Sequence, residues 1–271
     1  MRTCRRTVRV VTLSLVLGLG SASSASAFAP AATAPIHPGV MTSTQGAQCT
    51  ANFVFTGGGK TYIGQAAHCS GTGAATDTNG CTAASLPIGT PVQVDGATRP
   101  GRLAYNSWLT MQAKGETDPS TCQYNDLALV ELDPADVAKV NPSIPFWGGP
   151  TGINTVGVAT GAKVLSYGNS SLRQGIAQLS PKEGASLGTD SGGWNHPVYT
   201  VTPGIPGDSG SAFIDGAGRA LGVLSTVAIA PLPLSNGVGD ISRELSYEGA
   251  NGGPIVTLEK GTEPFRGPLL P

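Results

Sequence analysis

The sequence predicts an all-β fold, either a sandwich or a barrel. Short runs rich in β-branched and aromatic residues recur between turn signals, and no long segment has helical periodicity. The chain also contains 39 glycines and 21 prolines, which interrupt it throughout. The predicted strands lie at residues 49–56, 60–66, 91–95, 127–132, 162–167, 198–202 and 219–225.

Residues 1–27 have the pattern of a secretory signal peptide. Four arginines precede and flank an apolar run at residues 10–19, and Ala25-Ser26-Ala27 is a small-residue cleavage site. A core helix is the alternative, but the charge and cleavage pattern argue against it. Arg5-Arg6 leaves twin-arginine export open, although ordinary secretion is favoured. We therefore expect a secreted, extracellular protein.

Charge and hydropathy exclude two classes of partner. The chain has 16 basic and 17 acidic residues, and loss of the four signal arginines leaves 12 basic residues against 17 acidic ones. This acidic balance argues against a nucleic-acid partner. No other apolar run approaches the roughly 20 residues of a membrane span. We expect a monomer that binds neither nucleic acid nor membrane.

Four cysteines remain once Cys4 leaves with the signal: Cys49, Cys69, Cys81 and Cys122. An even count in an exported protein predicts two disulfides, and four cysteines allow three pairings. A zinc site is the alternative, but it needs closely spaced ligands such as Cys-x-x-Cys. The closest pair here is 12 residues apart, so we predict no metal and no cofactor.

The order of predicted elements divides the mature chain into two halves. Runs 49–56 and 60–66 flank a glycine turn and predict a hairpin. Residues 134–140 predict a turn or two of helix, and residues 240–248 a short C-terminal helix. A Pro/Gly-rich linker at 141–152 separates the halves.

The resulting domain prediction has five parts. The signal covers 1–27, an extended or partly disordered segment or short propeptide covers 28–44, and a Gly/Pro-rich tail covers 251–271. The two halves between them are 45–140 and 141–250.

Three separate motifs carry the residue types of nucleophilic acyl transfer. A serine hydroxyl needs a histidine to take its proton and a carboxylate to hold that histidine. His68 lies at the end of a predicted strand, Asp126 directly precedes the predicted strand 127–132, and Ser209 lies in Pro206-Gly207-Asp208-Ser209-Gly210. Alone, each has an ordinary interpretation as a loop histidine, a turn aspartate or a glycine-rich turn.

The glycines around Ser209 allow a tight bend and close approach of a substrate. In such a bend the backbone N–H groups of Gly207 and Ser209 can point together at a developing oxyanion. Ser191 lies in a second Asp-Ser-Gly-Gly string, at 190–193, but no glycine precedes that aspartate and no apolar hairpin follows. Ser209 is therefore the better nucleophile.

The order His68, Asp126, Ser209 on an exported all-β chain resembles the chymotrypsin-type serine peptidases. The resemblance covers roughly residues 45–250. It implies two packed antiparallel six-stranded β-barrels with the site in the crevice between them. It also implies a serine endopeptidase that acts on a protein or peptide substrate through an acyl-enzyme.

The same resemblance assigns several supporting residues. It implies a Cys49–Cys69 bridge, which leaves Cys81–Cys122, and a hydrogen bond from Ser225 to the catalytic aspartate. Asp208 would pair with a new N-terminal amine or with an internal arginine, for which Arg173 and Arg102 are candidates.

The resemblance gives only weak indications of which residue the enzyme prefers before the scissile bond. Thr226 and Val227 would line the site, and Val227 stands where many relatives have glycine, which narrows the pocket. Pro203 occupies the position of the acidic residue in trypsin-like members, and residues 198–207 carry no charge before Asp208. We expect a small or medium apolar residue before the scissile bond.

Two other functions remain open at this stage. The chain can be a trypsin-fold protein that binds a partner without cleaving it, or a serine esterase, since the same machinery hydrolyses esters. His37 and His196 have no evident role, and we expect both at the surface.

Overall fold

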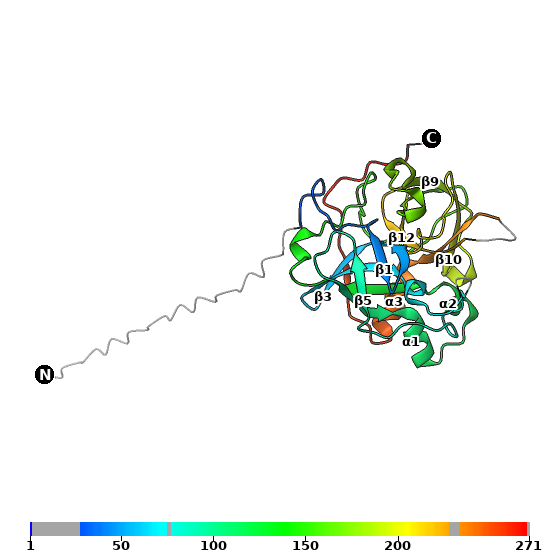
Figure 1. The fold of residues 1–271 in the computed structure, drawn as a ribbon. Helices are drawn as coiled ribbons and strands as arrows, with labels where there is room; N and C mark the ends of the chain where they lie inside the picture. Colours follow the sequence, from blue (N-terminus) through cyan, green and yellow to red (C-terminus); the bar gives the residue numbers. More distant parts are fainter. Residues whose placement is uncertain (2–27, 75–76, 228–232, 270–271) are drawn as a thin grey trace.

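A computed structural model describes residues 1, 28–74, 77–227 and 233–269. The chain folds into two β-rich halves that pack side by side (Figure 1). The all-β prediction is confirmed. The signal-peptide prediction lies outside the described residues, apart from Met1.

The first half forms one antiparallel sheet with the strand order β14-β3-β4-β7-β6-β5-β1-β2. Its strands are β1 (Met41–Thr44), β2 (Ala47–Thr50), β3 (Val54–Gly57), β4 (Lys60–Ala66), β5 (Pro91–Val94), β6 (Gly101–Asn106), β7 (Leu127–Glu131) and β14 (Thr257–Leu258). The sheet has eight strands, so the expectation of six was wrong for this half. The additional pairing comes partly from the tail, because β14 adds to the edge of β3.

The predicted hairpin forms between β3 and β4, with Gly57 opposite Lys60. Gly58 and Gly59 turn the chain with φ of 57° and 76°, as a two-residue hairpin turn requires. The predicted strand 49–56 is divided in two, however. Residues 51–53 separate β2 from β3; the Asn52 side chain accepts the Phe53 N–H, and the Asn52 N–H donates to Gly64 O.

The second half is a closed six-stranded barrel with the order β10-β13-β12-β11-β8-β9, as expected. Its strands are β8 (Lys163–Tyr167), β9 (Pro181–Ser186), β10 (Asn195–Thr200), β11 (Ala212–Asp215), β12 (Ala220–Val227) and β13 (Asn236–Asp240). The C-terminal helix α3 (Ile241–Ala250) follows β13 directly. Asp240 caps it by accepting the Arg243 N–H.

Two further helices were not predicted from the sequence: α1 (Ser107–Lys114) and α2 (Pro119–Tyr124). Asn106 caps α1 and Gly115 ends it with φ of 67°, so the signals for its ends were present in the sequence. The predicted helix at 134–140 is only a short 3₁₀ turn, Val137–Lys139. None of the helices in the described ranges has the length and apolarity needed to cross a bilayer.

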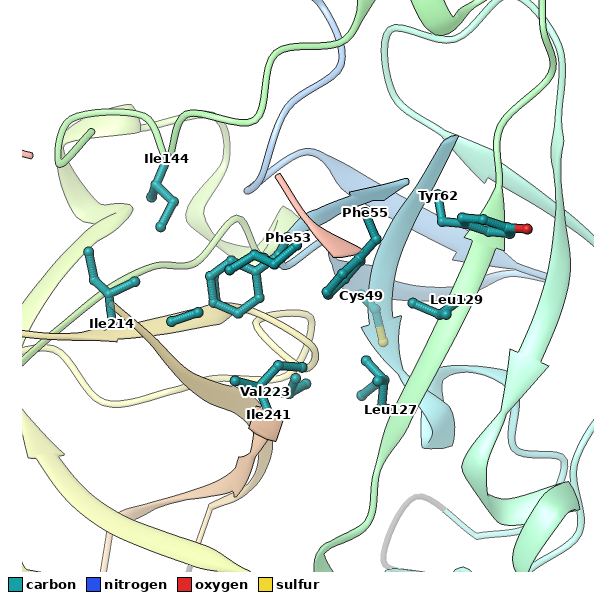
Figure 2. Packing of buried hydrophobic residues seen from close by; sticks show 14 of the residues in the cluster. Cys49, Phe53, Phe55, Tyr62, Leu127, Leu129, Ile144, Ile214, Val223 and Ile241 are labelled. Carbon is teal, nitrogen blue, oxygen red and sulfur yellow. The ribbon is translucent and has the colours of Figure 1, made fainter. Parts of the chain in front are cut away.

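The main hydrophobic core spans both halves. Phe53 and Phe55 are fully buried and share one cluster with Ile214 and Val223 of the second barrel. Figure 2 shows Phe53 between Ile214 and Phe55. Ile144 and Trp147 of the predicted linker also belong to this cluster. Because the core is shared, each half fixes the position of the other.

The N-terminal segment 28–44, which we expected to lie outside the first half, is part of it. Ile36 is fully buried and forms a parallel bridge with Val140. Ala29 N–H donates to Val140 O at 2.9 Å, and β1 lies within the sheet. Residues 28–44 are therefore packed rather than disordered, because Ile36 and Val40 complete the apolar cluster beneath the sheet.

We expect Ile36→Ala to lower the free energy of unfolding by about 2–5 kcal/mol, since it empties a fully buried site. Ile255→Ala is the matched control, because Ile255 is 83% exposed and should lose under about 0.5 kcal/mol. Urea denaturation measures both. Equal, small losses would show that residues 28–44 do not belong to the folded unit.

Candidate active site

A cavity of about 990 Å³ lies between the halves. His68 and Asp126 line it from the first half, and Gly207, Ser209 and Ser225 from the second. The three residues singled out by their sequence motifs therefore meet in one cleft.

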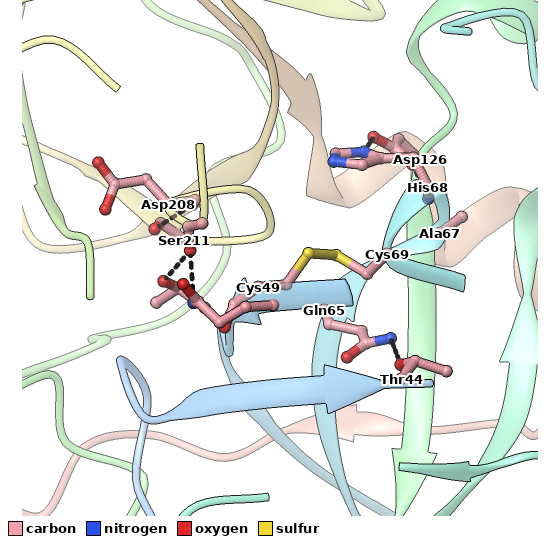
Figure 3. The surroundings of a disulfide bond; sticks show 12 residues. Thr44, Cys49, Gln65, Ala67, His68, Cys69, Asp126, Asp208 and Ser211 are labelled. Atoms are coloured by element: carbon pink, nitrogen blue, oxygen red, sulfur yellow. Dashed lines mark hydrogen bonds and ion pairs between the residues drawn. A yellow bond between two sulfur atoms is a disulfide. The ribbon is translucent and has the colours of Figure 1, made fainter. Parts of the chain in front are cut away.

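His68 is held directly by Asp126. It lies on a 3₁₀ turn, Ala67–Ser70, that follows β4, and its Nδ1 is 2.6 Å from Asp126 Oδ2. The His68 N–H also donates to Asp126 Oδ1 at 2.9 Å. Figure 3 shows the ring against the carboxylate. With Nδ1 engaged, the other ring nitrogen, Nε2, is left to exchange a proton.

Asp126 is 1% exposed, and a carboxylate so deeply buried needs hydrogen-bond donors around it. Ser225 Oγ supplies a third hydrogen bond, to Oδ2 at 2.6 Å. Burial lowers the pKa of His68, but the charge of Asp126 and the hydrogen bond to it outweigh burial and raise the pKa above its ordinary value. The pair thus favours a protonated imidazole, which a general base must become.

A disulfide anchors the histidine turn. Cys69 is bonded to Cys49 of β2, directly after His68 in the sequence (Figure 3). Cys81 is bonded to Cys122, so both pairings are those that the resemblance implies. The sulfurs of Cys49 and Cys69 lie near His68, but a disulfide offers no thiolate to a metal.

Almost every polar backbone group of the loop around Ser209 has a protein partner. Pro206 O accepts from Ser170 Oγ at 2.5 Å, and Gly207 O from Thr50 Oγ1 at 2.8 Å. Asp208 O accepts from Ser211 N at 3.0 Å, and Ser209 O from Thr50 N at 2.8 Å. The four carbonyls of the loop are thus fixed in direction.

The N–H groups of the same loop divide into two kinds. Asp208 N–H donates to Ile205 O and Gly210 N–H to Leu224 O. Within the described residues, the N–H groups of Gly207 and Ser209 donate to no protein acceptor. Gly207 has φ of 95°, and Pro206 O points to Ser170, which does not line the cavity. Because C=O and N–H of a trans peptide point in opposite directions, the Gly207 N–H points away from Ser170.

Ser209 lines the same cavity as His68. In the described part of the chain, its hydroxyl makes no hydrogen bond to His68 Nε2. In sites without substrate such bonds are often long and tighten when substrate arrives.

Asp208 is fully buried and paired with two cations. Arg173 Nη2 lies 2.5 Å from Asp208 Oδ2, and Lys182 Nζ lies 3.0 Å from the same oxygen. Of the two candidate arginines, Arg173 is the partner. Lys182 was not anticipated; its ammonium also donates to Pro203 O at 3.0 Å. Asp208 therefore has two internal cationic partners.

Glu244 of α3 is another residue that the motifs did not indicate. It is fully buried, and its Oε1 accepts the Asp126 N–H at 2.9 Å. Burial raises the pKa of Glu244 well above its ordinary value; the Asp126 N–H opposes this, while the charges of Asp126 and Asp240 add to it. A neutral Glu244 can hold the Asp126 backbone without placing a second charge beside it.

The remaining sequence candidates lie apart from this cluster. Ser191 lies on a short 3₁₀ turn next to Asp190, away from the cavity-lining residues. His196 is fully buried, so the expectation of a surface histidine was wrong; Asp240 and Thr189 bind its two ring nitrogens. His37 is partly buried and its Nδ1 is 2.7 Å from Pro38 O.

The substrate-binding candidates separate into two groups. Thr226 and Val227 line the cavity at the end of β12, together with Gly204 and Leu224. Pro203 does not line it; its carbonyl faces Lys182 behind the wall.

No protein-family model matches the chain, and no curated protein sequence matches it either. Solved structures do. Protease A of Thermobifida fusca superposes with a TM-score of 0.54 at 20% identity, covering 83% of this chain and 99% of that one. Cellulomonas bogoriensis chymotrypsin superposes with a TM-score of 0.50 at 17% identity, covering 83% and 98%. The chain therefore has the chymotrypsin-like fold of bacterial serine proteases.

We expect Glu244→Gln to reduce the loss of stability at high pH. Because folding raises the pKa of Glu244, the unfolding free energy falls as pH rises above the ordinary value of 4.5. Glutamine keeps the acceptor for Asp126 N–H and cannot ionise, so the difference between variant and wild type should grow from pH 5 to pH 9.

Glu248→Gln is the matched comparison, since burial raises the pKa of Glu248 only to about 7. Its advantage over wild type should stop growing above that pH. Urea denaturation across pH measures both variants. A Glu244→Gln protein whose stability follows wild type at every pH would contradict a neutral, buried Glu244.

Proposed function

We propose that this chain, with its chymotrypsin-like fold, is a secreted serine endopeptidase that cleaves peptide bonds through an acyl-enzyme. Ser209 is the nucleophile, His68 the general base, and Asp126 the group that orients and charges the histidine. The N–H groups of Gly207 and Ser209 form the oxyanion hole. Ser225 supports Asp126 through a hydrogen bond, and Asp208 supports the loop that carries Ser209.

One observation carries the proposal. Among the described residues, the backbone carbonyls of 206–209 and the Asp208 N–H are all paired within the protein, whereas the N–H groups of Gly207 and Ser209 donate to no protein acceptor. Gly207 and Ser209 are both partly exposed and line the cavity. Two such donors beside a serine, in a cleft that also holds a histidine bonded to a buried carboxylate, match the needs of acyl transfer.

The reaction follows from these positions. Ser209 Oγ attacks the substrate carbonyl while His68 Nε2 takes its proton, and the carbonyl oxygen becomes an anion between the two amides. Asp126 stabilises the imidazolium, whose raised pKa follows from that contact. His68 then gives the proton to the leaving amine. Water repeats the sequence against the ester, restores Ser209 and releases the acid.

Secretion is supported by the two disulfides, because such bonds persist in oxidising compartments. The structurally similar proteins are named as proteases, in keeping with a protein or peptide substrate.

We expect a fluorophosphonate probe to label the wild-type protein and to leave Ser209→Ala unlabelled, because the probe reacts with an activated serine. Ser191→Ala is the matched control and should label like wild type. Mass spectrometry locates the adduct. A wild type that does not react, with Ser209→Ala behaving the same, favours the binding-protein alternative.

Digestion then separates the two enzymatic alternatives. A peptidase cleaves casein and loses more than about 10³-fold of that rate in Ser209→Ala. Hydrolysis of p-nitrophenyl acetate without cleavage of casein or of a peptide library would instead identify an esterase.

We further propose that the enzyme prefers a small residue before the scissile bond. The wall beside Ser209 has two sides, the segment from Gly204 to Gly207 and the end of β12. A single Cβ on Gly204 would lie 3.2 Å from Leu224 Cδ2 and 3.3 Å from Val227 Cγ2. The space next to Gly204 is therefore narrow, which favours a small side chain over an aromatic ring there.

Hydrogen bonds of Asn236 also narrow the space between Gly204 and the end of β12. Asn236 is fully buried; its Oδ1 accepts the Gly204 N–H at 2.8 Å, and its Nδ2 bonds Thr200. The ammonium of Lys182 donates to Pro203 O, directly before Gly204 in the chain. Its positive charge disfavours a substrate lysine or arginine before the scissile bond.

A peptide library should therefore be cut after Gly, Ala or Ser. Val227→Gly should widen the space next to Gly204 and raise kcat/KM for a larger apolar residue such as Leu by about tenfold or more, since a methylene group in such a pocket counts for 10–200-fold. Val156→Gly controls for loss of a valine, because Val156 is 82% exposed. Cleavage chiefly after Arg, or after Phe, by the wild type would refute this preference.

A further inference from the structure

We propose that Thr50 and Gln48 of β2 are positioning residues that hold the oxyanion hole open from the opposite half of the molecule. The assignment rests on the proposed function, since it concerns the amides of the same site. Neither residue belongs to a motif that the sequence indicated.

Thr50 is fully buried, and its hydroxyl has a fixed direction. Oγ1 donates to Gly207 O at 2.8 Å and accepts from Asn169 N at 3.1 Å. The Thr50 backbone N–H donates to Ser209 O at 2.8 Å. Thr50 therefore forms hydrogen bonds to the loop on both sides of Asp208, at Gly207 O and Ser209 O.

Gln48 adds a second hydrogen bond to the same carbonyl, that of Gly207. Its Nε2 donates to Gly207 O at 3.0 Å and to Cys49 O at 2.8 Å. Its Oε1 accepts the Ser171 N–H at 2.9 Å. The amide is thus held at both ends, and it lines the cavity.

These contacts matter because Gly207 is the residue most able to turn. A glycine rotates between conformations at little cost, and rotation about Gly207 would swing its N–H away from the cavity. Ser170 Oγ fixes the peptide before Gly207 through Pro206 O. Thr50 and Gln48 fix the peptide after it, so φ is held at 95°.

The same short strand also positions the base. Cys49 lies between Gln48 and Thr50 and is bonded to Cys69, the neighbour of His68 (Figure 3). A shift of β2 would therefore move the base and the oxyanion donors together. Such preorganised donors act in the transition state, so their loss lowers kcat more than it changes KM.

The test is Thr50→Val, which keeps the shape of the side chain and removes its hydroxyl. We expect kcat on casein to fall about 10–100-fold, below the roughly 10²–10³-fold cost of losing a whole donor, with KM within about threefold. The rate of fluorophosphonate labelling should fall similarly. Thr50→Ser keeps the hydroxyl and should stay within about threefold of wild type.

Thr42→Val is the matched control. Thr42 is a buried threonine of β1, opposite Cys49, whose Oγ1 has no hydrogen-bond partner within the described ranges. It should leave kcat unchanged. Gln48→Met provides a second variant if Thr50→Val does not fold, because Gln48 is only partly buried; it should also lower kcat without raising KM in proportion.

Unchanged kcat per folded molecule in Thr50→Val and Gln48→Met, in a wild type that labels at Ser209, would overturn this assignment alone. Equal losses in Thr50→Val and Thr42→Val would overturn it too, because they would indicate a general packing effect. A wild type that never labels would overturn the proposed function and the positioning role with it.

Discussion

The tripeptide Gln48-Cys49-Thr50 ties the two halves of the site together. Through the Cys49–Cys69 bond it anchors the turn that carries His68, and through Thr50 it binds carbonyls of Gly207 and Ser209. His68 and Asp126 come from one half and Ser209 from the other, so neither half alone can hold the three residues in register. The shared core of Phe53, Ile214 and their neighbours brings the halves together, and this tripeptide sets the finer alignment.

Buried charge is the second constraint on the site. Asp126 and Asp208 are almost wholly buried, and a buried carboxylate is costly unless strong donors surround it. Asp126 is held by the ring and the backbone N–H of His68 and by Ser225; Asp208 is held by Arg173 and Lys182. Each carboxylate thus fixes one end of the cleft.

The sequence indicated the residues that are marked locally. His68-Cys69, Asp126 before an apolar strand, and Ser209 between glycines are visible within a few positions each. Thr50, Ser170, Lys182 and Glu244 are not, because their partners lie far away in the chain: Thr50 and Gly207 are 157 positions apart. The eight-stranded sheet escaped prediction for the same reason, since β14 pairs with β3 only after the chain has folded. Helix α1, by contrast, has local sequence signals, because Asn106 and Gly115 mark its ends. It was not predicted because it is short.

The central claim is that the loop around Ser209 is already arranged to receive an oxyanion. A crystal structure of the fluorophosphonate adduct tests this most directly. We expect phosphorus on Ser209 Oγ, with the phosphoryl oxygen about 2.7–3.1 Å from the N atoms of Gly207 and Ser209. Gly207 O should remain bonded to Thr50 and Gln48. An adduct on another residue, or a phosphoryl oxygen bound elsewhere with the Gly207 peptide turned, would contradict the claim.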